Sequence, residues 1–359
     1  MIFKNAELFN IEEVHELKEE GVYALSRIPE RVRAELNDKA KRAAYFGCGT
    51  EIRFNIEDEF VKLVLKRAPK EGAVLDTGIV EIYFGSFQAS WEYSPRILTT
   101  EAITEIIIKK PKHIKILERL TEERGLPFDP NLVRVILPYD WKNYLIDIEG
   151  NCAPPRAEQV PNQRYLAYGS SITHGSSTVG PNASYAMRTA ELLEADLINL
   201  GFAGGAYMEA AMADYIAARS DWDFATLEMG INVIEQWSVE QFADIIDYFI
   251  SKIALANKDK WIFCMDVFTC YLDYENSDKI IKFREIIKEK VAKHKLPKLV
   301  HLSGTDLLKS VTGLTIDLTH PSALGMEEIA RKLSYEISRY SRNLNHSLKS
   351  GSKGAYEND

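Results

Sequence analysis

Hydrophobic and polar residues alternate with a period of two between about Glu51 and Glu149. Short runs rich in Val, Ile, Phe and Tyr carry the pattern: EIRFNI, FVKLVLKR, GIVEIYFG, FQASWEY, AITEIIIKK, VRVILPY and NYLIDIEG. Turn-forming pairs such as Glu71-Gly72 and Asp129-Pro130 separate them. About seven short strands of this kind predict an antiparallel β-sandwich or jelly roll. The segment 113–125, HIKILERLTEERG, is helix-like, and we expect a helical excursion between strands there.

The pattern changes after Asn151. The segment CAPPRAEQVPNQ, rich in Pro and polar residues, is typical of a linker. Beyond it, the apolar runs RYLAYG, LINLG, FATLEMG, WIFCMDV and KLVHL alternate with stretches whose apolar residues lie three and four apart. Such alternation of strands and helices predicts an α/β fold, a parallel sheet with helices on both faces. We therefore expect a β-sandwich domain over 1–155, an α/β domain over 160–345 and a flexible polar tail over 346–359.

Composition narrows the class of protein. With 359 residues, 46% hydrophobic and 27% charged, the chain is globular and long enough for about two domains. The 44 Lys and Arg against 53 Asp and Glu give a net charge of −9, which disfavours a nucleic-acid partner. The N-terminal MIFKNAELFNIEEVHELKEEG lacks the apolar region of a signal peptide. We expect a cytoplasmic protein without a membrane partner.

The four cysteines are too few for a disulfide framework, and no two of them have CxxC spacing. We expect buried or half-buried free thiols and neither a metal nor another cofactor. The zinc-protease motif HExxH is also absent from the sequence.

Polar residues follow the predicted parallel strands, where open α/β sheets place their ligand sites. The segments are GSSITHG (169–175), NLGFAGG (199–205) and GIN (230–232), and DLTHP (317–321) precedes the last helix. Together they supply a serine hydroxyl, glycine amides, a side-chain amide and an acid–imidazole pair. These are the groups that acyl transfer needs: a nucleophile, its base, an orienting carboxylate and oxyanion donors.

The four segments, in this order over about 160–335, resemble the serine, glycine, Gly-x-Asn and Asp-x-x-His blocks of the SGNH (GDSL-type) hydrolase superfamily. The resemblance implies a flavodoxin-like three-layer fold with Ser171 as nucleophile. It implies Asp317 and His320 as the rest of a catalytic triad. The oxyanion donors would be the backbone N–H of Ser171, Gly204 and Asn232.

One position departs from the family pattern: Ser170 stands where the motif usually has Asp. The nucleophile assignment survives, but the hydrogen bonding of this loop must differ. The α/β-hydrolase elbow G-x-S-x-G does not fit, because Thr173 occupies its last glycine position.

Several residues also have structural interpretations. Ser171 could serve only as a helix N-cap, and Asn232 as a turn residue. His174 is expected in a solvated position rather than at the pocket mouth. Tyr207 and Trp237 could stack on a sugar or acyl group or pack in the core.

The layout, a β-sandwich before an SGNH domain, is similar to that of family two carbohydrate esterases. We expect a serine esterase for short acyl esters, with O-acetyl groups of carbohydrates as substrate. The alternatives are a lysophospholipase- or thioesterase-like hydrolase and a non-catalytic carbohydrate-binding protein. The sequence leaves open whether the protein forms a homo-oligomer.

Overall fold

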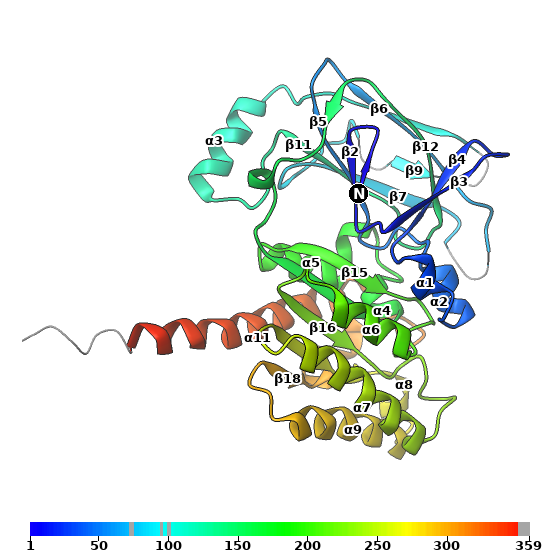
Figure 1. Cartoon of the computed structure of the whole chain (residues 1–359), viewed down its shortest axis with the longest axis vertical. Helices are drawn as coiled ribbons and strands as arrows, with labels where there is room; N and C mark the ends of the chain where they lie inside the picture. The colour runs from blue at the N-terminus through cyan, green and yellow to red at the C-terminus, as the bar shows by residue number, and fades with distance from the viewer. Residues whose placement is uncertain (72–74, 94–95, 99–101, 351–359) are drawn as a thin grey trace, which may run out of the picture.

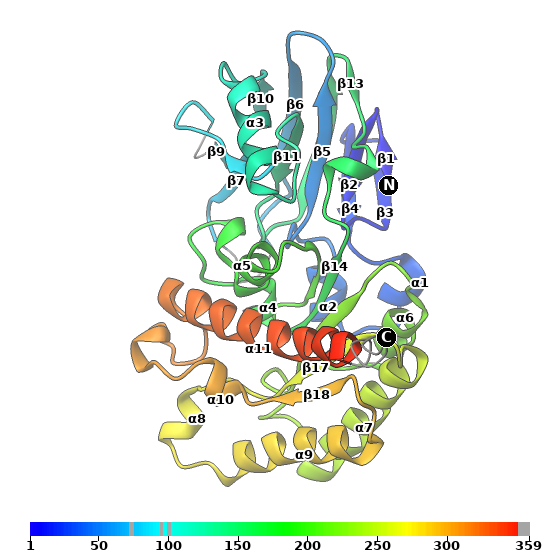
Figure 2. The same ribbon diagram turned by 90° about the vertical axis from the view of Figure 1, so that its left-hand side faces the viewer.

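The structure, a computed structural model, describes residues 1–71, 75–93, 96–98 and 102–350. Antiparallel strands form one end of the molecule, and a parallel sheet with its helices forms the other (Figures 1 and 2).

Two antiparallel sheets build the first part. The strands of the first sheet are β1 (Ile2–Phe3), β2 (Ala6–Phe9), β5 (Glu51–Ile56), β7 (Gly78–Phe84), β8 (Phe87–Gln88), β9 (Arg96–Leu98), β11 (Leu132–Ile136) and β13 (Cys152–Ala153). Their order is β1-β2-β5-β11-β7-β8, with β13 on β5 and β9 on β7. The strands of the second are β3 (Glu13–Leu17), β4 (Val22–Ser26), β6 (Val61–Arg67), β10 (Thr104–Ile108) and β12 (Asn143–Glu149), in the order β10-β6-β12-β4-β3.

Alternate side chains of the two sheets meet in one apolar core. Ile52 and Phe54 of β5 belong to the same buried cluster as Leu63 and Leu65 of β6. This face-to-face packing is that of a sandwich, and its jelly-roll character stays a prediction. The helix-like segment 113–125 forms α3 (Ile114–Arg124). Strands β1 to β4 lie before Glu51, where the predicted period of two begins, so the strands expected from that pattern did not include them.

The second part contains a parallel sheet. Its strands are β14 (Arg164–Gly169), β15 (Asp196–Gly201), β16 (Phe224–Glu228), β17 (Trp261–Met265) and β18 (Leu299–Leu302), in the order β15-β14-β16-β17-β18. This is the flavodoxin-like order, in which the first strand lies between the second and third. The predicted alternation of strands and helices is confirmed.

Helices cover both faces of this sheet. They are α4 (Ser171–His174), α5 (Tyr185–Leu192), α6 (Ala210–Ala218), α7 (Val239–Ala256), α8 (Tyr271–Tyr274), α9 (Asp278–His294), α10 (Gly304–Leu307) and α11 (Ala323–Ser350). Side chains of α6, α7 and α9 share one core with Leu166 and Tyr168 of β14, while α5 and α11 share another with Tyr165 and Ala167. Alternate residues of one strand thus face opposite layers.

Two short helices of the N-terminal part, α1 (Glu30–Arg33) and α2 (Asp38–Ala43), lie at the junction beside α6 (Figure 1). Val32 and Ala40 belong to the core that also contains Leu200 and Phe202. The first fifty residues therefore contribute to both parts. The division at 155–160 stays a prediction. Helix α11 continues past residue 346, where a tail was expected, and 351–359 lie outside the described residues.

Buried charges connect the two parts. The Arg27 guanidinium donates to four backbone oxygens, among them those of Asn199 at 2.8 Å and Gly201 at 2.8 Å. Arg53 of β5 forms two hydrogen bonds, of 2.7 and 2.6 Å, with the carboxylate of Asp196 at the start of β15. These contacts fix the sandwich against β15.

The four cysteines are buried free thiols, as expected: Cys48, Cys152, Cys264 and Cys270. Within the described ranges, we find no helix with the length and apolar character needed to cross a membrane.

Candidate active site

The chemically reactive segments converge at the carboxyl edge of the parallel sheet. Ser171 follows β14, Gly204 follows β15, and Asn232 follows β16. Asp317 and His320 lie in the loop before α11. The strand order changes direction between β14 and β16, and crevices that bind ligands form at such a point.

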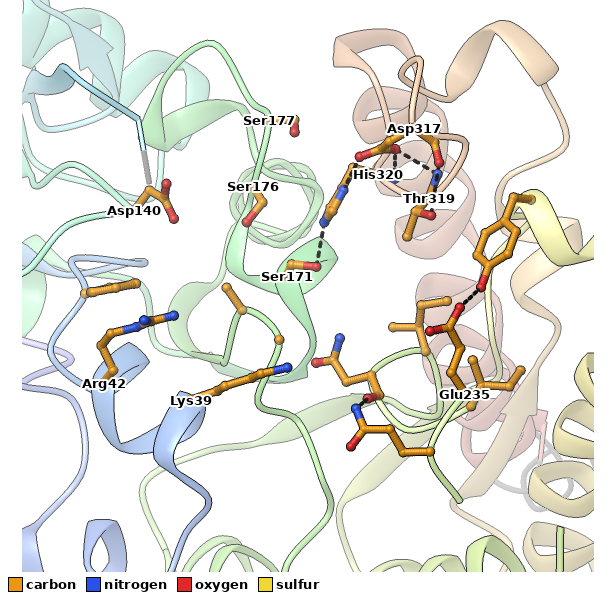
Figure 3. A pocket seen from close by; sticks show the side chains of 18 of the residues that line it. Lys39, Arg42, Asp140, Ser171, Ser176, Ser177, Glu235, Asp317, Thr319 and His320 are labelled. Atoms are coloured by element: carbon orange, nitrogen blue, oxygen red, sulfur yellow. Dashed lines mark hydrogen bonds and ion pairs between the residues drawn. The ribbon is translucent and has the colours of Figure 1, made fainter. Parts of the chain in front are cut away.

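Ser171, His320 and Asp317 form one hydrogen-bonded chain. The Ser171 Oγ lies 2.8 Å from His320 Nε2, and His320 Nδ1 lies 2.6 Å from Asp317 Oδ2. Figure 3 shows the imidazole between the hydroxyl and the carboxylate. When Nδ1 donates to the carboxylate, Nε2 is left to accept the hydroxyl proton. The geometry can therefore activate a serine nucleophile.

Asp317 also organises the turn that carries His320. Its Oδ1 accepts hydrogen bonds from the backbone N–H of Thr319 at 2.8 Å and of His320 at 2.9 Å, and from the Thr315 hydroxyl at 2.8 Å. Burial alone would raise the pKa of Asp317, but the hydrogen bonds from His320 and these donors hold it well below its usual range. The carboxylate is therefore ionised at neutral pH.

Ser170, not Ser171, caps the short helix α4. The Ser170 hydroxyl accepts from the N–H of Ile172 at 3.2 Å, and Ser171 is the first helical residue. This leaves the Ser171 hydroxyl for His320.

A residue that the sequence reasoning missed lies below this turn. Glu228, at the end of β16, accepts from the N–H of Ser170 at 2.6 Å and from the Thr173 hydroxyl at 3.1 Å. It is 1% exposed, and burial raises its pKa. A single acidic residue at the end of an apolar strand gave no signal of this contact.

Three N–H groups remain free to act on an oxyanion. Among the described residues, the backbone N–H groups of Ser171 and Gly204 have no acceptor. The Asn232 Oδ1 accepts from the N–H of Ala206 at 3.1 Å, which fixes the amide and leaves its NH₂ group available. Asn232 and Gly204 both line the same cavity as Ser171.

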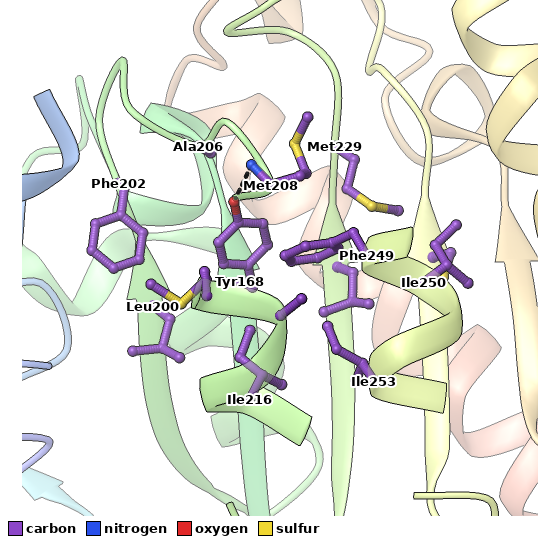
Figure 4. Packing of buried hydrophobic residues seen from close by; sticks show 14 of the residues in the cluster. Tyr168, Leu200, Phe202, Ala206, Met208, Ile216, Met229, Phe249, Ile250 and Ile253 are labelled. Atoms are coloured by element: carbon purple, nitrogen blue, oxygen red, sulfur yellow. Dashed lines mark hydrogen bonds between the residues drawn. The ribbon is translucent and has the colours of Figure 1, made fainter. Parts of the chain in front are cut away.

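The loop that carries Gly204 is held from two sides. The buried Tyr168 hydroxyl accepts from the N–H of Met208 at 3.0 Å (Figure 4). On the other side, a Cβ on Gly205 would lie 2.5 Å from the backbone nitrogen of Ala40 in α2. Only glycine permits this close approach, so α2 packs directly on the loop.

His174 is not solvated, contrary to the expectation from sequence. It is buried with edge-to-face contacts to Phe46 and Tyr139, side chains of the N-terminal part that the local sequence does not reveal. Burial and the nearby Arg27 lower its pKa to about 3, so the imidazole is neutral.

Tyr207 and Trp237 pack against each other, with ring centroids 5.9 Å apart at 75°. Both are half-buried against the core between the sheet and α7. This contact agrees with the packing interpretation of the two aromatic residues.

The cavity in front of Ser171 has a volume of about 720 Å³. One wall comes from the N-terminal part and carries Lys39, Arg42, Phe46, Leu75 and Asp140. The sequence reasoning did not anticipate this wall. Burial raises the pKa of Asp140 to about 6. Within the described part of the chain, no group of three or more His, Cys, Asp or Glu side chains is arranged to hold a metal ion.

Comparisons with known proteins identify a family for the part of the chain that contains the parallel sheet. Residues 162–338 match the GDSL-like lipase/acylhydrolase family. No curated protein sequence matches the chain.

Three solved structures are similar in fold. The salicylyl-acyltransferase SsfX3 from a tetracycline biosynthetic pathway has a TM-score of 0.76 at 17% identity, covering 94% of this chain and 95% of its own. A protein of Bacteroides ovatus named as a GDSL-like lipase has a TM-score of 0.66 at 17% identity, covering 94% and 98%. A family two carbohydrate esterase from Cellvibrio japonicus has a TM-score of 0.60 at 12% identity, covering 94% and 96%.

Proposed function

Through residues 162–338 the chain belongs to the GDSL-like (SGNH) hydrolases and is a serine ester hydrolase, and from this premise we propose that it removes short acyl groups from hydroxylated compounds, O-acetylated carbohydrates above all. The observation that carries the proposal is the hydrogen-bonded chain from Ser171 through His320 to Asp317, open to a cavity of about 720 Å³.

In the proposed mechanism, His320 takes the proton of the Ser171 hydroxyl while its oxygen attacks the ester carbonyl. The N–H of Ser171, the N–H of Gly204 and the Asn232 amide donate to the oxyanion. Each such donor is worth about 2.7–4 kcal/mol when it is removed. His320 then protonates the leaving alcohol, and water, deprotonated by His320, releases the acid from the acyl-enzyme. Asp317 holds the imidazole and stabilises its charged form.

The lining of the cavity supports a short acyl group and a polar alcohol. Its apolar side chains, such as Phe46 and Ile234, are interspersed with the charged Lys39, Arg42 and Glu235. A long fatty acyl chain would have to lie against these charges, whereas hydroxyl groups would form hydrogen bonds with them. This composition favours an acetylated sugar over a lysophospholipid or a fatty thioester.

The test is hydrolysis of 4-nitrophenyl acetate and of acetylated oligosaccharides by wild type and Ser171→Ala. We expect Ser171→Ala to lose nearly all activity with an unchanged melting temperature. Ser170→Ala, which removes only the cap of α4, is the matched control and should be much milder. Wild-type turnover by Ser171→Ala would show that Ser171 is not the nucleophile, and a non-catalytic protein would give no turnover at all. Adding glycerol as an acceptor separates hydrolysis from acyl transfer.

The length of the acyl group gives a separate prediction. We expect kcat/KM for 4-nitrophenyl esters to be highest for acetyl and other short chains and to fall towards decanoyl, because the charged wall cannot solvate a long alkyl chain favourably. A kcat/KM that keeps rising with chain length would favour the lipase-like alternative.

A further inference from the structure

Two cationic side chains of α2 face the proposed nucleophile across the cavity. Lys39 and Arg42 lie one helical turn apart, and Figure 3 shows both extending from α2 towards the cavity that Ser171 lines. Both side chains are exposed. In the described part of the chain, neither has a hydrogen-bond acceptor or an ion-pair partner within the protein.

Helix α2 is held firmly in this place. The Asn37 side chain caps the helix by accepting from the N–H of Ala40 at 3.1 Å, and it donates to the backbone oxygen of Gly205 at 2.9 Å. The N–H of Asn37 donates to Glu209 at 3.0 Å. Because Gly205 follows the proposed oxyanion donor Gly204, the backbone that carries the two cations is fixed relative to the proposed site of reaction.

The carboxylates around the cavity are already engaged by the protein. Asp317 binds His320, Glu235 accepts from the Tyr271 hydroxyl, and Asp140 accepts from the N–H of Leu75 at 3.1 Å. Arg42 interacts electrostatically with Asp140, but among the described residues neither Lys39 nor Arg42 forms an ion pair with a carboxylate. Other exposed cations, such as Arg31 and Lys258, also lack an ion pair among the described residues, but Lys39 and Arg42 line the same cavity as Ser171.

A second cavity, of about 330 Å³, continues from the first and shares Arg42, Phe46 and Asp140 with it. Five cationic side chains and three carboxylates line it, and one of the cations, Lys41, lies 3.9 Å from Asp38. Arg42 thus lies where the two cavities meet, and the second cavity leaves room for part of a substrate.

We propose that Lys39 and Arg42 bind an anionic group, a carboxylate or a phosphate, on the alcohol part of the acyl ester. The inference rests on the proposed function and refines it, because the substrate becomes the O-acyl derivative of an acidic sugar or of a sugar phosphate. Arginine binds both groups through paired N–H donors, and such charge-assisted hydrogen bonds are stronger than neutral ones.

The experiment compares three probes that share the sugar ring and the acetyl ester and differ in the group at C6: a methyl mono-O-acetyl glucoside, the corresponding glucuronoside and the corresponding glucoside 6-phosphate. We expect wild-type kcat/KM to be at least about tenfold higher for one of the anionic probes than for the neutral one. The anionic probe that reacts faster identifies carboxylate or phosphate as the source of the charge. Equal kcat/KM for all three probes would overturn the inference.

The variants Lys39→Met, Arg42→Met and the double variant test the residues. On the preferred anionic probe, the double variant should lose about 10- to 100-fold in kcat/KM, as expected for the loss of one or two charge-assisted hydrogen bonds. On the neutral probe, which offers the two cations only hydroxyl groups, the loss of kcat/KM should be at least about fivefold smaller. Arg31→Met, an exposed position of α1 outside both cavities, is the control and should change neither.

An equal loss of kcat on all probes would assign Lys39 or Arg42 to the reaction itself and overturn the inference, while leaving the esterase function intact. Failure of the proposed function has a different signature: wild type then hydrolyses none of the acetylated probes, or Ser171→Ala hydrolyses them as fast as wild type.

Discussion

Asp317 has two roles that one substitution can separate. It accepts from His320 Nδ1 at 2.6 Å, and its other oxygen holds the turn through the N–H groups of Thr319 and His320. In Asp317→Asn, the amide keeps one accepting oxygen, but the imidazole loses the carboxylate that fixes its tautomer. We expect kcat to fall by more than about tenfold, or 1.4 kcal/mol of barrier. The loss should be smaller than that of His320→Ala.

Kinetics of Asp317→Asn, His320→Ala and the double variant check this prediction. If the pair acts as a unit, the double variant is no worse than His320→Ala alone. Wild-type activity in Asp317→Asn would mean that Ser171 and His320 work as a dyad.

At the scale of single elements, the end of β16 supports the turn that presents Ser171. Glu228 accepts from the N–H of Ser170 and the Thr173 hydroxyl through one oxygen, Oε2, while Oε1 has no partner in the described structure. We expect Glu228→Ala to lower kcat by about tenfold or more with little change in KM, because the turn loses its anchor but the cavity wall does not. Glu228→Gln keeps an accepting oxygen and should restore kcat to within about threefold of wild type.

Steady-state kinetics, with melting temperatures alongside, check the role of Glu228. A rise in KM at constant kcat would instead place Glu228 in substrate binding.

The sequence predicted elements where the information is local. The four polar segments could be located because each follows a strand or precedes the last helix, and Asp317 and His320 are only three residues apart. The burial of His174 could not be predicted, because the rings that enclose it come from Phe46 and Tyr139. Lys39 and Arg42 are likewise ordinary surface residues of a short helix until packing brings α2 onto the loop at Gly205.

At the scale of the whole molecule, a buried ionic network joins the sandwich to the parallel sheet. Glu51 accepts from Arg134 at 2.6 and 2.8 Å and from Arg53 at 2.8 Å, and Arg53 binds Asp196. Burial alone would raise the pKa of Glu51, but the two guanidinium groups hold it at about 2, below its ordinary value of 4.5.

This network predicts a loss of stability in acid. Because the pKa of Glu51 is lower in the folded state, the unfolded state binds the proton first as the pH falls. The contribution of Glu51, up to about 3 kcal/mol, is present above about pH 5 and is lost as the pH falls towards 2. Urea unfolding between pH 7 and 3 should show a shallower pH dependence for Glu51→Gln, which is also less stable at neutral pH. Parallel curves for the two proteins would contradict the prediction.

Two patterns in the sequence predicted the overall fold. The period of two indicated antiparallel strands, and the alternation of apolar runs with helical stretches indicated a parallel sheet. The contacts between the halves were not accessible. In the sequence, nothing distinguishes Arg27 and Arg53 from other charged residues. Their buried partners lie more than 140 positions away along the chain: the backbone oxygens of Asn199 and Gly201 for Arg27, and the carboxylate of Asp196 for Arg53.

The wall built by α2 has an evolutionary consequence. More than a hundred codons separate Arg42, which would select the ester, from Ser171, the first of the groups that would break it. Mutation or recombination in the first segment can redirect the enzyme to a differently charged ester while the second is inherited unchanged. Substrate preference and turnover can then diverge independently among descendants of such a gene.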